Sequence, residues 1–390
     1  MNYIFSIASF LAFFFAVLLL KKKTKAAHDR VLLYWLIYLG LFTGLYLLSG
    51  FDFFIRFKLF PVFVISLFLL HGPFLFLYTS ALTLGKKSLQ RKDFLHFVPF
   101  LTFAVYLFFA SLFPDYAANI SMDHVASHVQ PPLFFILLLL ATAFSGPVYF
   151  ILCIKEVQKH KSNYPNNFSS IEKINLDWLR ILLYIFGAIW SVFIIIAVTH
   201  HVFHYSSMHF CINGLLLSLS AFIVLLGYYG LRQQEIFTHF SIEDYRHGSL
   251  QNAPEGAKVK YANLALSEDQ ITSYADRIDR YMKEEKPYLN PDLTLPQLAL
   301  ELNTSTHQLS RIINEHYGRN FYDFINGYRI EEVKDKLFDP DFYNFSLLGI
   351  AFESGFNSKS AFNRTFKKAT GLTPSEYKKT QSRPSNKDGR

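Results

Sequence analysis

Seven long stretches without a single Asp, Glu, Lys or Arg constrain the fold of this 390-residue chain more than any other feature. Each has about the 17 to 25 residues that a helix needs to cross roughly 30 Å of hydrocarbon, where every backbone polar group must be bonded internally. We therefore predict seven transmembrane helices. The stretches are Tyr3–Leu20, Val31–Leu48, Leu59–Leu84, Phe94–Phe113, Leu133–Ile154, Ile181–Val198 and Phe210–Leu231.

Basic residues alternate between the connecting loops and predict the orientation of these helices. The loops after the first, third and fifth stretches carry 14 Lys and Arg, whereas the intervening loops carry only Arg56 and Lys58. Positively charged loops stay in the cytoplasm. We expect a multi-pass protein of the cytoplasmic membrane, with its N-terminus outside and its C-terminal part in the cytoplasm. The first stretch has its charges after it, so we expect it to be an anchor and not a cleaved signal.

The net charge of +8 arises entirely in the apolar part of the chain. Residues 1–230 hold 16 of the 38 Lys and Arg but only 8 of the 30 Asp and Glu, so residues 231–390 hold 22 of each. The basic surplus therefore serves membrane topology and gives no argument for nucleic-acid binding. Such an argument must come from local patterns in the second part.

The apolar stretches offer little support for catalysis. None contains a lysine for a retinal Schiff base or an acid for a proton relay. Ala143-Phe144-Ser145-Gly146 approximates a serine nucleophile turn, with His71 in another stretch, but the first glycine is missing and Ser-Gly pairs are common packing elements. Cys153 and Cys211 fall on opposite membrane faces and lack zinc-site spacing. We predict that the chain is not an enzyme and has no cofactor or structural metal.

Histidines are the remaining polar candidates in the membrane part. His71 precedes Gly72-Pro73, where proline removes a backbone donor and predicts a kink. A buried histidine bonded to a neighbouring helix is the favoured interpretation of His71, ahead of a place in a signal pocket. The outer-loop histidines could bind Zn²⁺ or Cu²⁺ or titrate together, although histidine is also an ordinary interfacial residue. The candidate pocket for a small-molecule or ion signal comprises His71, His124, His128, His200, His201 and His204.

The composition becomes polar after Leu231, and Gly and Pro residues up to about Leu266 indicate a linker. From residue 267 onward, capping boxes predict a series of short helices, and glycines 318, 355 and 371 fall at helix ends or turns. We expect seven helices and no strand in this part. The boxes are Ser267–Gln270, Thr294–Gln297, Ser305–Gln308 and Thr373–Glu376.

An internal repeat organises these helices. Leu298-Ala299 recurs 52 residues later as Ile350-Ala351, and beyond the turn an offset of 53 matches Leu309 with Phe362. Each copy predicts a short helix, a tight turn and a second helix, which is the helix-turn-helix arrangement that places its second helix in a major groove. A long helix from Phe321 to Phe338 is expected to fix the two copies relative to each other.

The residues of this repeat resemble the DNA-binding domain of AraC/XylS-type transcription regulators over roughly residues 271–379. The preceding spans resemble, by architecture alone, those of membrane-tethered members of that family. Val333 departs from the alanine usual on the linker helix and suggests slightly altered packing. The motifs that carry the resemblance are Leu298-Ala299, Leu309-Ser310-Arg311, Gly318, Asn326-Gly327-Tyr328-Arg329, Ile350-Ala351, Gly355-Phe356, Phe362-Asn363-Arg364, Phe366-Lys367, Gly371, Thr373-Pro374 and Tyr377.

The two second helices carry polar side chains with the spacing of one helix face. Arg suits guanine and Asn suits adenine, whereas the lysines further along are better placed for phosphates. A solvated basic surface, or arginines held by acids such as Glu353, is the competing interpretation. The expected base contacts are His307, Ser310, Arg311, Lys359, Ser360, Asn363 and Arg364. The expected phosphate contacts are Lys367, Lys368, Lys378 and Lys379.

The sequence therefore predicts an all-α protein in which a seven-helix transmembrane bundle precedes two helix-turn-helix motifs on a long linker helix. The expected parts are a sensor or anchor (1–231), a cytoplasmic linker (232–266), a DNA-binding domain (267–380) and a disordered tail (381–390). The expected partners are double-stranded promoter DNA, the lipid bilayer, a signal, RNA polymerase and a second copy of the chain. Two alternatives remain: a membrane transporter or enzyme with a regulatory tail, and a regulator released by proteolysis of the linker.

Overall fold

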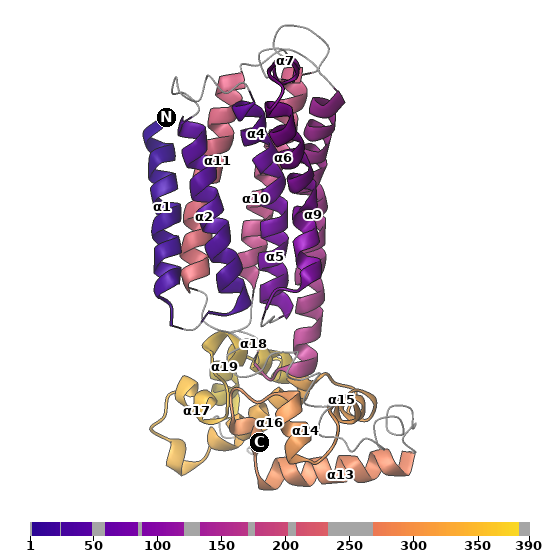
Figure 1. Cartoon of the computed structure of the whole chain (residues 1–390). Helices are drawn as coiled ribbons and strands as arrows, with labels where there is room; N and C mark the ends of the chain where they lie inside the picture. Colours follow the sequence, from indigo (N-terminus) through magenta and orange to yellow (C-terminus); the bar gives the residue numbers. More distant parts are fainter. Residues whose placement is uncertain are drawn as a thin grey trace, which may run out of the picture. The chain divides into compact units, whose positions relative to one another are not determined.

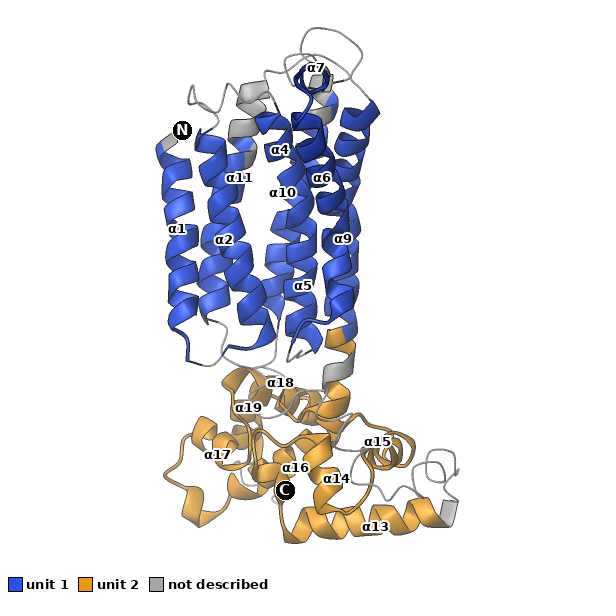
Figure 2. Ribbon diagram, in the orientation of Figure 1, with its two compact units in different colours: residues 1–159, 176–243 blue, residues 160–175, 244–390 orange. Residues whose placement is uncertain are grey.

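The structure is a computed structural model that describes residues 2–23, 25–48, 59–84, 88–120, 133–170, 176–201, 208–232 and 268–381. Every regular element in these ranges is a helix, so the predicted all-α class is confirmed. An isolated antiparallel bridge joins Phe168 to Thr294. The chain divides into two compact units, residues 1–159 with 176–243 and residues 160–175 with 244–390 (Figure 2). The predicted linker and tail fall almost wholly outside the described residues.

The long helical segments of the first unit alternate in direction along the chain, with α4 and α5 forming one such segment (Figure 1). Helix α1 packs against α2 and α11, and α10 packs against α11. The elements are α1 (Asn2–Lys21), α2 (Ala27–Leu48), α4 (Phe60–Ser66), η1 (Leu67–Leu70), α5 (His71–Leu84), η2 (Arg91–Phe97), α6 (Val98–Ser111), α7 (Pro114–Asn119), α9 (Leu133–Asn167), α10 (Asp177–His201) and α11 (Met208–Arg232).

Five of the described helical segments are long and apolar enough to cross a membrane. They match the first five predicted stretches, with the fifth helix continuing past Ile154 to Asn167. The sixth and seventh predicted stretches coincide with α10 and α11, parts of which lie outside the described side chains. The count of seven spans therefore stays a prediction.

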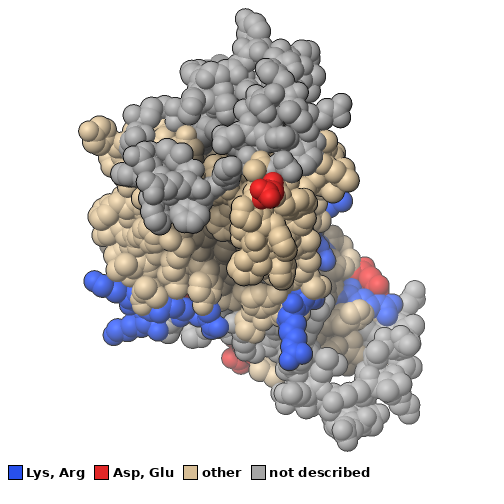
Figure 3. Space-filling view, turned by 45° about the horizontal axis from the view of Figure 1, so that its top comes forward, with Lys and Arg blue, Asp and Glu red and all other residues tan. Residues whose placement is uncertain are grey.

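The outward surface of these helices is apolar. Phe10 on α1, Phe108 on α6 and Phe144 on α9 have 66%, 63% and 66% of their surface exposed. The visible surface of the helices is nearly free of charged side chains, and Lys and Arg gather along one edge of it (Figure 3). Water-soluble folds rarely expose apolar side chains on such a scale.

The third predicted span is interrupted where the sequence places its proline. Pro73 has no backbone N–H, and its ring crowds the carbonyl four residues earlier. The chain accordingly tightens into a 3-10 turn at Leu67–Leu70 between α4 and α5. The predicted distortion thus appears just before His71.

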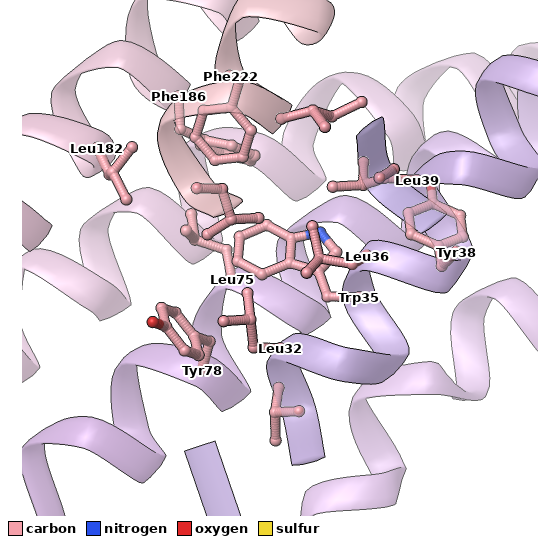
Figure 4. Packing of buried hydrophobic residues seen from close by; sticks show 14 of the residues in the cluster. Leu32, Trp35, Leu36, Tyr38, Leu39, Leu75, Tyr78, Leu182, Phe186 and Phe222 are labelled. Carbon is pink, nitrogen blue, oxygen red and sulfur yellow. The ribbon is translucent and has the colours of Figure 1, made fainter. Parts of the chain in front are cut away.

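Aromatic side chains from several helices pack in the core of the first unit. The ring of Trp35 on α2 lies 5.9 Å from that of Tyr78 on α5 and 5.8 Å from that of Phe222 on α11 (Figure 4). Such pairs contribute about 0.5–1.5 kcal/mol each beyond their buried area. These contacts join α2, α5 and α11 although the helices are far apart in sequence.

His71 is buried and bonded to another helix, which supports the favoured interpretation. Its Nδ1 lies 3.1 Å from the Tyr38 hydroxyl on α2, and that hydroxyl donates to the Leu67 carbonyl at 2.8 Å. The imidazole also lines an apolar cavity of about 30 Å³ together with Phe42, Phe68, Ile189, Trp190, Leu216 and Leu219. The side chains of His124, His128, His200, His201 and His204 lie outside the described residues.

Gly146 also serves packing, as expected of a membrane Ser-Gly pair. A methyl group on Gly146 would lie 2.2 Å from the Trp190 indole, so only glycine fits against this ring. Cys153 is a buried free thiol.

The second unit contains seven α-helices in the range 268–381, as predicted. The linker helix ends at Lys336, slightly before the expected Phe338. The elements are α13 (Glu268–Glu284), η4 (Pro287–Leu289), α14 (Leu295–Glu301), α15 (Thr306–Glu315), α16 (Phe321–Lys336), η5 (Pro340–Phe342), α17 (Leu347–Glu353), α18 (Lys359–Thr370) and α19 (Pro374–Gln381).

Side-chain caps begin these short helices where the sequence predicts them. Thr294 and Ser305 form reciprocal capping boxes with Gln297 and Gln308. Thr373 exchanges the same pair of bonds with Glu376. Each cap stabilises its helix by about 1 kcal/mol, which matters for helices of only two turns. The predicted box at Ser267 begins outside the described residues.

Helix α16 supplies side chains to two separate cores. Its N-terminal half contributes Phe321, Phe324 and Ile325 to a core shared with α13, α14 and α15. Its C-terminal half contributes Ile330 and Val333 to a core shared with α17 and α18. Val333 is fully buried there, so the departure from alanine fills the core. The two helix-turn-helix copies are thus fixed on one rigid helix.

Candidate nucleic-acid interface

The turns of the two copies each contain a residue with positive φ at equivalent positions. Asn303 and Gly355 lie 52 residues apart, the offset of the repeat, and have φ angles of +47° and +91°. This left-handed conformation favours glycine and tolerates asparagine. Each turn leads into the second helix of its copy, which packs against the first, as in a helix-turn-helix motif.

Helix α18 presents one polar face and one apolar face. Ala361, Phe362, Thr365 and Phe366 are buried against the second core. All four expected base-contact residues of this copy, Lys359, Ser360, Asn363 and Arg364, are exposed on the opposite side. The Ser358 side chain caps the N-terminus of the helix. The base-contact candidates of the second copy thus share one accessible face.

Helix α15 has the same arrangement, but its polar groups are more engaged. His307 is exposed, whereas Ser310 and Arg311 are half-buried. The Arg311 Nε donates to both carboxylate oxygens of Glu315, at 2.9 and 2.8 Å, and Asn314 donates to the Ser310 carbonyl at 2.8 Å. The acid that holds this arginine is therefore Glu315, one turn along the same helix. The i,i+4 spacing was the available signal.

Arg364 connects the second recognition helix to the linker helix. Its Nη2 donates to the Tyr322 hydroxyl at 3.3 Å, and that hydroxyl lies 3.3 Å from the Thr365 Oγ1. Arginine has five N–H groups, and this hydrogen bond engages one of them.

The expected phosphate-contact lysines differ in their partners. Lys367 and Lys379 are exposed and Lys378 is half-buried. Lys368 forms hydrogen bonds of 2.8 and 2.9 Å with the carboxylate oxygens of Asp323 on α16. Such exposed pairs are worth at most about 1 kcal/mol, so DNA phosphate can compete for this lysine.

A buried cluster between η4 and α16 contains functional groups that the sequence did not single out. Glu332 accepts from Lys286 at 2.9 Å and from Tyr288 at 3.0 Å, and lies 3.3 Å from Lys336. Burial raises the pKa of the Glu332 carboxyl, but hydrogen bonds from these three side chains outweigh it and lower the pKa below its usual 4.5. The cluster holds the segment before α14 against the linker helix.

Helix α13 packs onto the first copy. The hydroxyls of Tyr317 and Tyr328 both donate to the Asp279 Oδ1, at 2.9 and 2.8 Å. Burial and the Asp279 carboxylate raise the pKa of both phenols. Ala275, Ile278 and Met282 of this helix are buried.

Known proteins match this second unit. The family described as a helix-turn-helix domain matches residues 298–380. An uncharacterized HTH-type transcriptional regulator of Staphylococcus aureus (strain COL) is 32% identical over 113 residues, which are 29% of this chain and 14% of that protein. The uncharacterized HTH-type transcriptional regulator YtdP of Bacillus subtilis (strain 168) is 27% identical over 114 residues, again 29% and 14%.

The match is therefore confined to one part of each protein, since this chain spans only 14% of the length of these relatives. No solved structure matches the chain. The matched residues run from the middle of α14 to the last turn of α19 and include the turns at Asn303 and Gly355. The C-terminal part of this chain is a helix-turn-helix domain of the AraC/XylS type.

Proposed function

We propose that the chain is a membrane-anchored, sequence-specific DNA-binding transcription regulator of the AraC/XylS type. The observation that carries this proposal is the pair of equivalent helix-turn-helix copies fixed on α16, each with an accessible polar face on its second helix. A rigid connection allows both second helices to enter adjacent major grooves about 34 Å apart.

The residues on these faces divide by chemistry into two groups. Arg364 and Arg311 suit guanine O6 and N7, Asn363 suits adenine, and each such bidentate pair discriminates by about 1–3 kcal/mol. His307, Ser310, Lys359 and Ser360 complete the two faces. Lys367, Lys368, Lys378 and Lys379 neutralise phosphates and set the salt dependence of affinity. RNA polymerase and a second copy of the chain at a repeated half-site are the further partners.

The lipid bilayer is the proposed environment of the first unit. The exposed rings on α1, α6 and α9 support this, because lipid chains solvate an apolar surface that water does not. The excess of Lys and Arg in alternate loops supports an orientation with the N-terminus outside and the DNA-binding part in the cytoplasm. The anchor is thus a multi-pass part of the cytoplasmic membrane.

The sensing role falls to the spans or the outer loops. The outer-loop histidines suit an ion or a proton, and the apolar cavity of about 30 Å³ beside His71 suits only a ligand of a few atoms. Replacing Trp190 with alanine would enlarge this cavity, and a change in the inducing signal would identify it as the sensor.

The proposed function is tested by crosslinking the tagged full-length chain to the genome and sequencing the recovered DNA. Discrete promoter sites are expected, and they should disappear with Arg364→Ala. The control is Lys283→Ala, which removes an exposed basic residue from α13, outside both second helices. Recovery of the same random DNA from all three chains would contradict sequence-specific binding.

Immunoblots of membrane and soluble fractions separate anchored action from release by a protease. Full-length protein in the membrane during induction is the expected result. A soluble fragment that carries the DNA-binding domain, appearing on induction, would replace the anchored mechanism with release. Substrate flux through the purified chain in vesicles would instead favour a transporter.

A further inference from the structure

A short segment outside the helix-turn-helix copies packs into the second unit. Residues 168–170 follow the last turn of α9 and belong to the same compact unit as α13 to α19. Phe168 forms the antiparallel bridge with Thr294. The Ser169 backbone N–H donates to the Leu293 carbonyl at 3.2 Å, and its hydroxyl donates to the same carbonyl at 2.6 Å. Ser169 is only 1% exposed, so the segment is buried within the second unit.

The site that holds residues 168–170, called the seat below, is built around the buried guanidinium of Arg329 on α16. Arg329 is 1% exposed, and burial lowers its pKa to about 10. Its Nε donates to the Tyr288 carbonyl at 2.7 Å and one Nη2 hydrogen to the Asn290 carbonyl at 2.7 Å. A third donor reaches the Asn326 Oδ1 at 3.2 Å.

The two remaining donors of Arg329 are taken by the segment. Nη1 donates to the Ser169 carbonyl at 3.0 Å, and Nη2 donates to the Ser169 Oγ at 3.1 Å. The Asn326 amide also donates to the Ser169 carbonyl, at 3.1 Å. All five guanidinium N–H groups therefore have acceptors only while Ser169 is present. Leaving buried donors unpaired costs about 1–3 kcal/mol each, so the seat favours an occupant.

The segment contacts both helix-turn-helix copies at once. Leu293 lies directly before the cap of α14 in the first copy. In the second copy, the Asn357 amide donates to the Ser170 Oγ at 2.6 Å, and Asn357 directly precedes Ser358, the cap of α18. The N-terminal end of a recognition helix is the part that contacts base edges. Ser170 thus sits at the end of α18 that a groove would receive.

One face of α16 carries both the residues that hold Ser169 and Tyr322, which is the hydrogen-bond partner of Arg364. Tyr322, Asn326 and Arg329 are spaced by four and three residues, which places them on one helix face. Tyr322 accepts from Arg364, and Asn326 and Arg329 hold Ser169. A duplex that follows Lys359 to Arg364 along α18 would meet the seated segment beside Asn357.

We propose that residues 168–170 form an autoinhibitory strap, which occupies the seat made by Leu293, Asn326, Arg329 and Asn357 and must leave before α18 enters a major groove. The strap directly follows α9 in the chain. The proposal rests on the proposed DNA-binding function.

A disulfide between positions 168 and 294 tests, without any DNA, whether residues 168–170 pack against the DNA-binding domain. Directly opposed residues of an antiparallel pair have Cβ atoms about 4.5–5.5 Å apart, which a disulfide can span after a small shift. Full-length Phe168→Cys/Thr294→Cys, with a protease site inserted between residues 232 and 268, is oxidised in nanodiscs and then cleaved. The two fragments should stay joined on a non-reducing gel and separate on reduction. The matched control is Asn166→Cys/Thr294→Cys, because Asn166 is exposed on the last turn of α9. Equal joining in both, or none in the first, would overturn the seating.

The same disulfide tests the inhibition. The oxidised chain should bind a 40-base-pair duplex at least tenfold more weakly than the reduced chain, with recovery on reduction. The single variant Thr294→Cys controls for the lost cap. Added duplex should slow disulfide formation, because linkage between two ligands of one domain is reciprocal. Equal affinity in the two redox states would overturn the strap. Absence of binding in both states, and in the unaltered chain, would instead overturn the proposed function.

A second variant releases the strap without a covalent link. Ser169→Pro removes the N–H and the hydroxyl that Leu293 accepts, and should tighten duplex binding at least threefold in the full-length chain. Asn166→Ala is the matched control and should leave affinity unchanged. Weaker binding by Ser169→Pro, with α18 still protected from hydrogen exchange, would show that the segment supports the domain and would overturn inhibition.

Discussion

Each helix-turn-helix copy has a turn with positive φ and packs its second helix against α16. The second helices differ in how many of their polar side chains already form hydrogen bonds within the domain. On α15, Glu315 holds Arg311 through two hydrogen bonds and Asn314 bonds to Ser310. On α18, the corresponding candidate residues are exposed, and Arg364 donates to the neutral Tyr322 hydroxyl. The Arg311–Glu315 ion pair must open before Arg311 can contact a base, and this cost is specific to α15.

The turns of the two copies also differ in how closely neighbouring atoms approach them. A methyl group on Gly355 would lie 2.3 Å from the Tyr288 carbonyl and 2.9 Å from the Arg329 Nε. The first copy has Asn303 at this position. The second copy is thus pressed against the linker helix at a point where only glycine fits.

The largest expected effect comes from Gly355→Ala. Positive φ costs an alanine roughly 1–2 kcal/mol and the backbone clash a further 1–3 kcal/mol, so α17 and α18 should lose about 3 kcal/mol of stability. Hydrogen exchange of these helices in the full-length chain measures the loss. The matched control is Gly318→Ala, which has a φ of +62° but no heavy atom within 4 Å of the added methyl. Equal losses in the two variants would mean that crowding at Arg329 does not distinguish the copies.

Arg364→Ala against Arg311→Ala tests the comparison at the level of DNA. Arg364→Ala should weaken specific binding by about 1–3 kcal/mol, or roughly 5- to 150-fold, while non-specific binding changes less. Arg311→Ala should lose less, because part of its interaction with a base offsets the broken Glu315 pair. Mobility shifts over several salt concentrations measure both. A larger loss from Arg311→Ala would reverse the assignment of the main base-contact helix.

Lys367 and Lys368 on α18 test how far an existing ion pair reduces a lysine's contribution to the salt dependence of DNA binding. Lys367→Ala should weaken binding to all sequences alike and reduce the salt slope by about 0.9, as expected for one lost phosphate contact. Lys368→Ala should change the slope less, because Asp323 already neutralises Lys368. Identical slopes for the two variants would show that this ion pair opens completely on DNA.

The smallest expected effect concerns the attachment of the first copy to α16. The folded-state pKa of Glu332 lies below its usual 4.5, so its contribution to stability is present above that pH and is lost as pH falls through the lower folded value. Glu332→Gln should reduce hydrogen-exchange protection of α16 by about 1 kcal/mol at pH 7, and the difference should shrink as the pH falls below 4.5. Glu331→Gln, in an exposed pair with Lys334, is the control. If the loss of protection in Glu332→Gln did not depend on pH, the negative charge of Glu332 would not be its cause.

Local signals in the sequence predicted the helices of the second unit. Side chains three residues apart determine the caps at Thr294, Ser305 and Thr373, and apolar periodicity determines the faces of α15 and α18. The distortion before His71 likewise follows from Pro73 alone. Such features are predictable because the interacting residues are close in sequence.

Contacts between distant segments were not predictable in this way. Asn326 and Arg329 belong to a recognised motif, but nothing near them in sequence indicates that Ser169 supplies their acceptors. Ser169 itself is an unremarkable serine in a polar stretch. The Glu315 partner of Arg311 is different, since its i,i+4 spacing was visible and was overlooked.

Methylation protection of guanine N7 on a promoter fragment, by the full-length chain in lipid nanodiscs, tests the central claim most directly. The account predicts two protected clusters in adjacent major grooves, about 10 base pairs apart on one face of the duplex, and loss of one cluster with Arg364→Ala. No protection, or uniform protection unaffected by Arg364→Ala, would contradict the claim that a membrane-held chain contacts DNA bases through these two helices.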